Sequence, residues 1–355
     1  MFLGIIGVNG YTGQGLLQAL SLNQDYKVTL VTSRGDAGKS LAEANPSLMG
    51  VPAYEGLELV HPDFLEDIQK KDPKSFPEIF FLAVSHGASM KLVPRILKLG
   101  ARVIDLTGDF RLKDKSLYPK FYKMEHSAPE LLQDAVYGLP ELHREDIMKA
   151  KLVANPGCYP TSIILAAAPL AKNSLLKPHA PLIADSKSGV SGAGKRAEVD
   201  YSYCELNDNF KAYKIVGHQH TPEAKGELEA LTQERVSLSF TPHLAPMSRG
   251  ILTTLYAQLK DGVTLDQIHK AYLDFYRDAP FVRLRLKEVS VNVLDVRGTN
   301  FCDLSMALDE EAGVLKVISV IDNLSRGAVT QALVNLNLMT GKSETQGIPL
   351  VALRP

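Results

Sequence analysis

Short apolar runs alternate with helical patterns along roughly the first 155 residues of the chain. The runs at 2–8 and 78–84 are apolar along most of their length rather than at every second position, and 27–32 is predicted as a strand from its β-branched residues. A strand that is apolar on both faces is typical of a parallel sheet covered by helices on both sides. Helical patterns at 13–21 and 90–99 supply such helices. We therefore expect an open α/β domain in this part of the chain.

The pattern changes after Cys158. A helix rich in small residues, 161–171, leads to longer strands with fewer helices between them, at 182–187, 235–241, 251–259 and 314–321. Such an order indicates a second α+β domain built on a mixed, largely antiparallel sheet. The apolar run 325–339 is helical, and we place it back on the first domain. The expected domains are therefore 1–157, completed by 325–355, and 158–324.

Length and charge narrow the class of protein. The chain has 355 residues, more than one core usually organises, and a formal net charge of −1. Nucleic-acid-binding proteins usually carry a basic excess, so we expect no nucleic-acid partner. No apolar run is long enough for a membrane span, and Phe2–Gly7 lacks a basic leader. Three cysteines are too few for a disulfide framework, so we expect a reducing compartment, the cytoplasm.

A glycine-rich turn joins the first apolar run to the first helix, with the sequence Gly7-Val-Asn-Gly10-Tyr11-Thr12-Gly13. Glycine lets the backbone approach a pyrophosphate, and a helix N-terminus offers unpaired N–H groups and a partial positive charge. The spacing is a weak signal by itself, and a turn without a ligand is the alternative. Because the turn lies between strand and helix, we expect a Rossmann-type dinucleotide-binding domain.

The end of the second strand favours NADP over NAD. An acidic residue there would bind the ribose hydroxyls of NAD. Here Ser33 and Arg34 follow the strand, and a hydroxyl with a guanidinium suits a 2′-phosphate. Asp36 lies close enough to keep NAD open, and Arg34 is otherwise a solvated cation.

Cys158 has the surroundings of a nucleophile. It follows a strand and an Asn-Pro-Gly turn, and a helix begins just after it. Free N–H groups and the helix dipole stabilise a thiolate at such a place, and Pro160 is favourable in a first helical turn. The alternative is a buried small residue, and we interpret Cys204 and Cys302 in that way.

Two histidines can act as the acid/base partner that a cysteine nucleophile needs. His218 and His220 lie at a helix start, and His220 and Glu223 can meet on one helix face, where the carboxylate would fix the histidine tautomer. A metal pair is the alternative, but no matching ligand cluster accompanies it, so we predict no metal site. We choose His220 as the acid/base, with His218 as the alternate.

Two further segments are suited to anions. The loop 185–196 combines hydroxyls, glycines and cations, and main-chain N–H groups in such a loop can hold a phosphate. A flexible polar loop is the alternative. The segment 105–111 follows a strand end, where the ligand crevices of α/β domains open. Arg111 there either clamps a carboxylate or phosphate or pairs with Asp109.

At these residues the sequence resembles N-acetyl-γ-glutamyl-phosphate reductases, within the semialdehyde dehydrogenase superfamily. The motifs occur in one order over nearly the whole chain, at Gly7–Gly13, Asp105–Arg111, Tyr137–Glu141, Asn155–Thr161, Asp185–Lys195, His218–Glu223 and Asp322–Leu324. One departure is Gln219, where many members have arginine.

The resemblance implies an NADPH-dependent reduction of N-acetyl-γ-glutamyl phosphate to the semialdehyde and phosphate, in arginine biosynthesis. Cys158 would form a thioester, and His220 would return a proton to sulfur or oxygen. With Glu223 these residues form the expected catalytic set. We expect the cofactor at Gly7, Gly10, Tyr11, Thr12, Gly13, Ser33, Arg34, Ser85, Ser188, Gly189 and Asn323. We expect the substrate at Arg111, His218, Ser191, Gly192 and Lys195.

Other readings of the same motifs remain open. Paralogues that reduce a carrier-linked aminoadipyl phosphate in lysine synthesis share the catalytic motifs. A non-catalytic NADP sensor would need the nucleotide loop but no reactive thiol, and a dehydrogenase without covalent chemistry would leave Cys158 as a bystander. We expect a homo-oligomer, either a dimer or a tetramer, with a small-molecule substrate.

Overall fold

The computed structural model describes residues 1–195, 197–286 and 290–354 and divides the chain into two compact units. Unit 1 comprises Met1–Pro156 and Val329–Ile348, and unit 2 comprises Gly157–Ala328 and the residues from Pro349 onward. Arg196, at the end of the predicted anion loop, lies outside the described residues. Among the described residues, no helix has both the length and the apolarity that a membrane span requires.

Unit 1 contains a seven-stranded sheet of order β3-β2-β1-β4-β5-β7-β6, and every pairing described in it is parallel. Its strands are β1 Phe2–Ile6, β2 Lys27–Thr32, β3 Leu59–Val60, β4 Ile79–Leu82, β5 Arg102–Asp105, β6 Val136–Tyr137 and β7 Leu152–Ala154. Its α-helices are α1 Tyr11–Leu20, α2 Leu41–Ala44, α3 Leu65–Lys71, α4 Ser89–Lys98, α5 Leu117–Phe121, α6 Pro140–Lys149 and α11 Thr330–Met339.

The apolar runs explain this arrangement. Phe80 and Phe81 point to opposite faces of β4, and both are 0% exposed. A sheet with two such faces must be covered on both sides, which confirms the predicted doubly wound α/β domain. The late helix α11 belongs to this unit: Asn335 Nδ2 donates to Gly138 O at 2.9 Å and to Asn155 Oδ1 at 3.0 Å.

Unit 2 contains a second seven-stranded sheet, of order β12-β13-β14-β11-β8-β10-β9. Its strands are β8 Leu182–Ser188, β9 Lys211–Ala212, β10 Leu238–Leu244, β11 Ile251–Gln258, β12 Val282–Leu284, β13 Cys302–Asp309 and β14 Val314–Ile321. Its α-helices are α7 Cys158–Lys172, α8 Tyr203–Leu206, α9 His220–Thr232 and α10 Leu265–Phe275.

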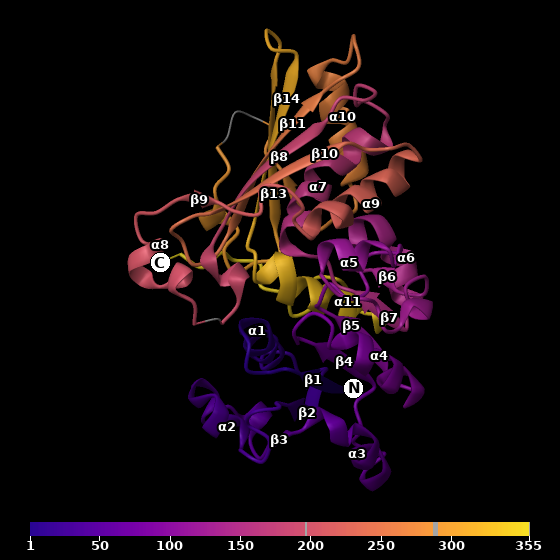
Figure 1. Cartoon of the computed structure of the whole chain (residues 1–355), viewed down its shortest axis with the longest axis vertical. Helices are drawn as coiled ribbons and strands as arrows, with labels where there is room; N and C mark the ends of the chain where they lie inside the picture. The colour runs from indigo at the N-terminus through magenta and orange to yellow at the C-terminus, as the bar shows by residue number, and fades with distance from the viewer. Residues whose placement is uncertain (196, 287–289, 355) are drawn as a thin grey trace. The chain divides into compact units, whose positions relative to one another are not determined.

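The sheet of unit 2 is mixed and largely antiparallel, as predicted. The pairs β8–β11, β11–β14, β13–β14 and β9–β10 are antiparallel, whereas β8–β10 and β12–β13 are parallel. Burial alternates along β11, so one face of the sheet is more deeply covered than the other. Helix α7 packs on β11 and β14, and Figure 1 shows α7, α9 and α10 on the same side of these strands.

Two elements of unit 2 differ from the expectation. The strand β13 was not expected, because its polar residues interrupt an apolar pattern. Asp303 in this strand is only 1% exposed and is bound by Arg283 at 2.5 Å and by Arg285 at 3.1 Å. An ion pair with a buried carboxylate and two partly exposed arginines therefore takes the place of an apolar contact. The strand expected at 235–241 runs instead from Leu238 to Leu244.

Candidate active site

Cys158 is the first residue of α7, three residues earlier than the helix expected from its small residues. Gly157 is the N-cap, and its N–H donates to Glu223 Oε1 at 2.7 Å. Glu223 comes from α9 and is 2% exposed. A carboxylate at a helix N-terminus is stabilised by the dipole. Glu223 therefore fixes the end of α7 that carries the thiol.

A close approach of Gly327 encloses Cys158 on another side. Gly327 lies in a π-helical turn, Ser325–Val329. A Cβ atom at Gly327 would be 2.6 Å from Cys158 Cβ and 3.0 Å from its Cα, closer than carbon atoms pack. Only glycine fits here without moving the cysteine.

The two histidines lie side by side in different environments. Their ring centroids are 4.9 Å apart, and the Tyr159 ring contacts both rings edge-on. His218 is 3% exposed, and burial, with the nearby Lys214 charge, lowers its pKa to about 3. Its Nδ1 accepts the N–H of His220 at 3.1 Å. His218 is therefore neutral near pH 7, while His220 is partly exposed.

Two tyrosines line the same region. The Tyr159 and Tyr213 hydroxyls are 3.1 Å apart, and burial raises the pKa of Tyr213 to about 12. Both phenols are therefore neutral at physiological pH. Tyr213 was not predicted, since it lies in a segment without a regular pattern.

The structure brings together four of the predicted residues near the end of β8. Asn323 Nδ2 donates to Ser191 Oγ at 3.0 Å, and its Oδ1 accepts the Gly250 N–H at 2.7 Å. A Cβ atom at Gly192 would be 3.5 Å from Ser188 Oγ and 3.6 Å from Asn323 Nδ2. Lys195 is exposed farther along the loop.

The main chain of this loop is largely engaged. The N–H groups of Gly189, Ser191 and Gly192 donate to main-chain carbonyls at 2.9, 3.1 and 3.3 Å. An anion in this loop would therefore be held by side chains, rather than by these N–H groups as the glycine-rich sequence had indicated.

A buried ion pair positions Asn323 and was missed from the sequence. Asp322 is 0% exposed, and it accepts from Arg249 Nη2 at 3.0 Å and from the Leu324 N–H at 2.9 Å. Arg249 also donates to Ser325 Oγ at 2.8 Å. The motif that contains Asp322 was recognised by resemblance, but a lone arginine 73 residues away carries no local signal.

In unit 1, the three glycines of the predicted nucleotide loop have different structural roles. Gly7 has φ +95°, and a Cβ there would be 2.4 Å from Ala83 O. A Cβ at Gly13 would be 2.3 Å from Gly7 O, so both glycines are required by packing. A Cβ at Gly10 meets nothing within 4 Å. Gly10 therefore leaves open space before α1, which has no side-chain cap. Tyr11 is exposed and Thr12 is half-buried beside it.

The residues after β2 leave Arg34 exposed. Asn9 Nδ2 donates to Ser33 Oγ at 3.1 Å and to Asp36 Oδ2 at 2.6 Å. Lys39 pairs with Asp36 at 2.7 Å, and this hydrogen bond lowers the pKa of Asp36. Asp36 was the residue that left NAD possible as the cofactor, and its carboxylate is thus already bound by two side chains.

Arg111 lies at the carboxyl edge of the parallel sheet and is 9% exposed. Its Nε donates to Asn155 O at 2.8 Å and its Nη2 to Leu106 O at 3.0 Å. Two main-chain carbonyls therefore fix its orientation. Ser85, the predicted cofactor residue after β4, is exposed. Within the described ranges, no cluster of three or more His, Cys, Asp or Glu side chains is arranged to hold a metal.

Both units match known protein families. Residues 3–150 match the family described as semialdehyde dehydrogenase, NAD binding domain. Residues 158–323 match semialdehyde dehydrogenase, dimerisation domain. The chain is 46% identical to the N-acetyl-gamma-glutamyl-phosphate reductase of Syntrophobacter fumaroxidans, over 98% of this chain and 97% of that protein. It is also 46% identical to the reductase of the same name from Geotalea daltonii, over 99% of both chains.

The chain belongs to the N-acetyl-γ-glutamyl-phosphate reductase family. The chain shares its fold with aspartate semialdehyde dehydrogenases. The Francisella tularensis enzyme superposes with a TM-score of 0.69 at 16% identity, covering 96% of this chain and all 100% of its own. The Candida albicans enzyme, solved with NADP, gives 0.68 at 13% identity, over 96% and 98% of the two chains. At such identities the likeness concerns the fold alone.

Proposed function

We propose that this protein reduces N-acetyl-γ-glutamyl phosphate to N-acetyl-glutamate 5-semialdehyde and phosphate with NADPH, as a step of arginine biosynthesis. The observation that carries the proposal is the place of Cys158 at the first position of α7, where Glu223 fixes the helix end. A thiolate is stabilised at such a position and can attack an acyl phosphate. Full-length relatives that bear the reductase name support the choice of substrate.

Unit 1 fits NADP. The open space at Gly10, before the uncapped N-terminus of α1, suits a pyrophosphate. The exposed Arg34 suits a 2′-phosphate, because Asp36 is already bound by Asn9 and Lys39. We assign Ser85, Ser188, Gly189 and Asn323 to the same cofactor. When bound, NADPH supplies the hydride that reduces the acyl carbon.

The protein's own residues perform the remaining chemistry. The Cys158 sulfur bonds to the acyl carbon as the carbon–oxygen bond to phosphate breaks, which leaves a thioester. His220 takes the thiol proton and passes it to the departing phosphate. After reduction, cleavage of the carbon–sulfur bond releases the aldehyde, and a solvent proton passed through His220 restores the thiol. His218 is less suited to proton transfer, because burial keeps it neutral.

The substrate needs partners for two anionic groups. Arg111, Ser191 and Lys195 are the groups that we assign to its phosphate and carboxylate, and we assign His218 and Gly192 to the substrate as well. An N-acetylated substrate has no ammonium group. Burying an unpaired ammonium would cost several kcal/mol, so a free amino acid is disfavoured.

We infer that the protein works in the cytoplasm as a homo-oligomer. Cys158 must remain a thiol, which a reducing compartment ensures. Unit 2 matches a family described as a dimerisation domain and exposes several large apolar side chains: Val199, Tyr203, Phe210, Ile215 and Val216. Exposed apolar groups of this kind are typical of subunit contacts.

The reverse reaction tests the proposal. We expect phosphate-dependent reduction of NADP, followed by absorbance, with N-acetyl-glutamate semialdehyde and little with aspartate semialdehyde. We expect Cys158→Ser to abolish this activity while NADPH binding stays within about twofold of the wild type. An active serine variant, within about tenfold of the wild type, would contradict the thioester. Turnover of only a carrier-linked aminoadipate derivative would assign the protein to lysine synthesis.

A further inference from the structure

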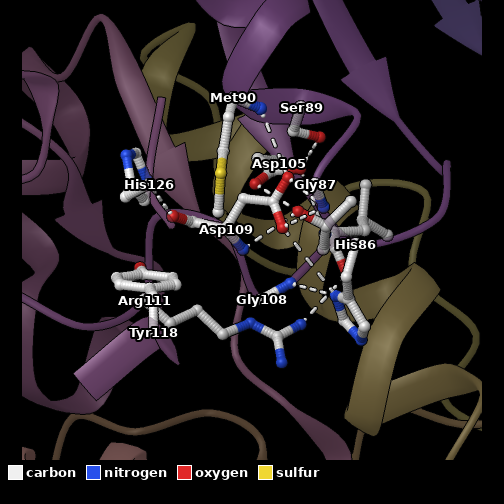
Figure 2. A network of polar contacts seen from close by, with 12 residues as sticks. His86, Gly87, Ser89, Met90, Asp105, Gly108, Asp109, Arg111, Tyr118 and His126 are labelled. Carbon is white, nitrogen blue, oxygen red and sulfur yellow. Dashed lines mark hydrogen bonds and ion pairs between the residues drawn. The ribbon is translucent and has the colours of Figure 1, made fainter. Parts of the chain in front are cut away.

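Two loops meet at the carboxyl edge of the unit 1 sheet. One follows β4 and contains Ser85, and the other follows β5 and leads to Arg111 (Figure 2). The Asp109 side chain is 0% exposed and joins them. Its two carboxylate oxygens accept the Gly87 N–H at 2.8 and 2.9 Å, and Oδ2 also accepts the Met90 N–H at 3.2 Å. The Asp109 carboxylate, on the loop after β5, thus caps α4, the helix that follows the loop after β4.

Further hydrogen bonds connect the same loops. The Gly108 N–H donates to His86 Nδ1 at 2.9 Å, in the opposite direction along the chain. Ser89 Oγ, at the start of α4, donates to Asp105 Oδ1 at 2.7 Å. Gly108 itself has no room for a side chain, because a Cβ there would be 2.3 Å from the Tyr122 hydroxyl. The two loops are therefore joined by hydrogen bonds in both directions and packed closely at Gly108.

This arrangement costs stability. Burial raises the pKa of both Asp105 and Asp109, and the Asp109 charge raises that of Asp105 further. His126 Nε2 lies 2.7 Å from the main-chain carbonyl oxygen of Asp109, and its Nδ1 accepts the Ala128 N–H at 3.1 Å. An apolar pair would hold two loops together at lower cost. The carboxylate offers something else, namely two acceptors that fix main-chain N–H groups in place.

We propose that Asp109 is a positioning residue, which holds the loop of Ser85 against the segment of Arg111 so that the groups binding cofactor and substrate keep a fixed spacing. The inference rests on the proposed function for the roles of Ser85 and Arg111. Asp109 itself touches neither ligand. It acts through the Gly87 and Met90 N–H groups and through its place two residues before Arg111.

The test compares two Asp→Asn variants of the full chain. Asp109→Asn keeps the shape but replaces one acceptor with an NH₂ group that faces an N–H donor. Asp114→Asn is the control, because Asp114 is exposed in the same segment and caps only Ser116, at 2.8 Å. The measurements are the Kd of NADPH, from nicotinamide fluorescence, together with KM and kcat in the aldehyde assay.

We expect Asp109→Asn to raise the Kd of NADPH or the KM of the aldehyde about tenfold, with a smaller change in kcat, and Asp114→Asn to match the wild type. A lower melting temperature with Kd and KM unchanged, measured well below that temperature, would mean a purely structural role and overturn the proposal. If Asp109→Asn does not fold, His86→Ala decides. It removes the other connection at a side chain that is 42% exposed, and unchanged constants there would equally overturn the proposal.

The fluorescence measurement separates this proposal from the proposed function. NADPH binding does not depend on which acyl phosphate is reduced. A wild-type protein that binds NADPH but is inactive on N-acetyl-glutamate semialdehyde would refute the substrate, while the effect of Asp109→Asn on Kd would still test the positioning role.

Discussion

Gly327 and Cys158 are so close that the smallest added group would disturb the thiol. The methyl of Gly327→Ala would lie 2.6 Å from Cys158 Cβ, so either α7 or the π-helical turn must shift. A shift of this size at the proposed nucleophile is expected to lower kcat/KM by at least about tenfold. The control is Gly226→Ala on α9, where a Cβ meets nothing within 4 Å and alanine favours the helix. Equal kinetics for the two variants would contradict this account.

Asp105 should make stability depend on pH in an unusual direction. Burial, and then the Asp109 charge, raises its pKa in the folded protein to about 7, whereas an unfolded aspartate titrates near about 4. Between these values the folded protein holds more protons. The contribution of Asp105 is therefore fully present below about pH 4 and is lost as pH rises to about 7.

Asp105→Asn cannot ionise and should remove that contribution. Relative to the wild type, we expect the variant to gain more than about 1.4 kcal/mol of unfolding free energy between pH 4.5 and pH 8, the value of one pKa unit. Urea unfolding at both pH values measures it. A difference between the two proteins that does not change with pH would mean that Asp105 titrates normally. The lowered pKa of His218 makes stability rise with pH instead, but this contribution is the same in the wild type and the variant and cancels in the comparison.

Single residues were predictable where their chemistry is local. Cys158 was identified from the turn before it and the helix after it, and both surround it in the structure. The Arg249–Asp322 pair was not predicted, because its two residues lie 73 positions apart in the sequence and the residues around each carry no distinctive pattern. Glu223 was expected to act on His220 from the helix spacing. Its hydrogen bond to Gly157 depends on how α9 packs on α7, which spacing along one helix cannot reveal.

At the scale of elements, two glycines of the β1–α1 turn allow an effect on NADPH binding to be distinguished from an effect on stability. Gly10→Ala is compatible with its φ of −77° and places a methyl group in open space. We expect the Kd of NADPH to rise at least about tenfold, because the methyl occupies the position proposed for the pyrophosphate, with an unchanged melting temperature.

Gly13→Ala should do the reverse. Its methyl would lie 2.3 Å from Gly7 O, so α1 must move away from the end of β1. We expect a loss of about 1–3 kcal/mol in stability, the usual cost of overpacking. Thermal unfolding with and without NADPH distinguishes the two variants. A destabilised Gly10→Ala protein would show that Gly10 serves the fold rather than the ligand.

Strands were predictable where residues of one kind, apolar or β-branched, run along the whole strand. The apolar β4 and the β-branched β2 were expected within two residues of their ends. The strand β13 was not, because Asp303 is buried by ion pairing rather than by apolarity. A buried hydroxyl cluster also escapes any periodicity: Ser162 Oγ on α7 is within hydrogen-bond distance of Thr253 Oγ1 and of Ser319 Oγ, both at 2.9 Å. These bonds set where the helix of Cys158 lies on its sheet.

At the scale of the whole molecule, self-association follows from the exposed side chains of unit 2. Light scattering should give a mass that is a multiple of the 38.8 kDa chain. Tyr203 and Val216 are 77% and 92% exposed, and we expect Tyr203→Asp with Val216→Asp to lower that mass. Leu22→Asp, at an 80% exposed position in unit 1, is the control. A monomeric wild type, or an unchanged mass in the double variant, would exclude this surface.

The path of the chain between the units has a consequence for synthesis on the ribosome. Unit 1 is interrupted after Pro156 and resumes at Val329, so α11 is made only after all of the intervening segment. Until then Gly138 and Asn155 lack the amide of Asn335, and the sheet lacks a helix that packs on β5. Unit 1, which begins first, therefore cannot be completed until Gly157–Ala328 of unit 2 have been made. A nascent chain halted before residue 329 would expose unfinished apolar surface of unit 1 to chaperones and proteases, although all of unit 2 except the residues from Pro349 onward would already be made.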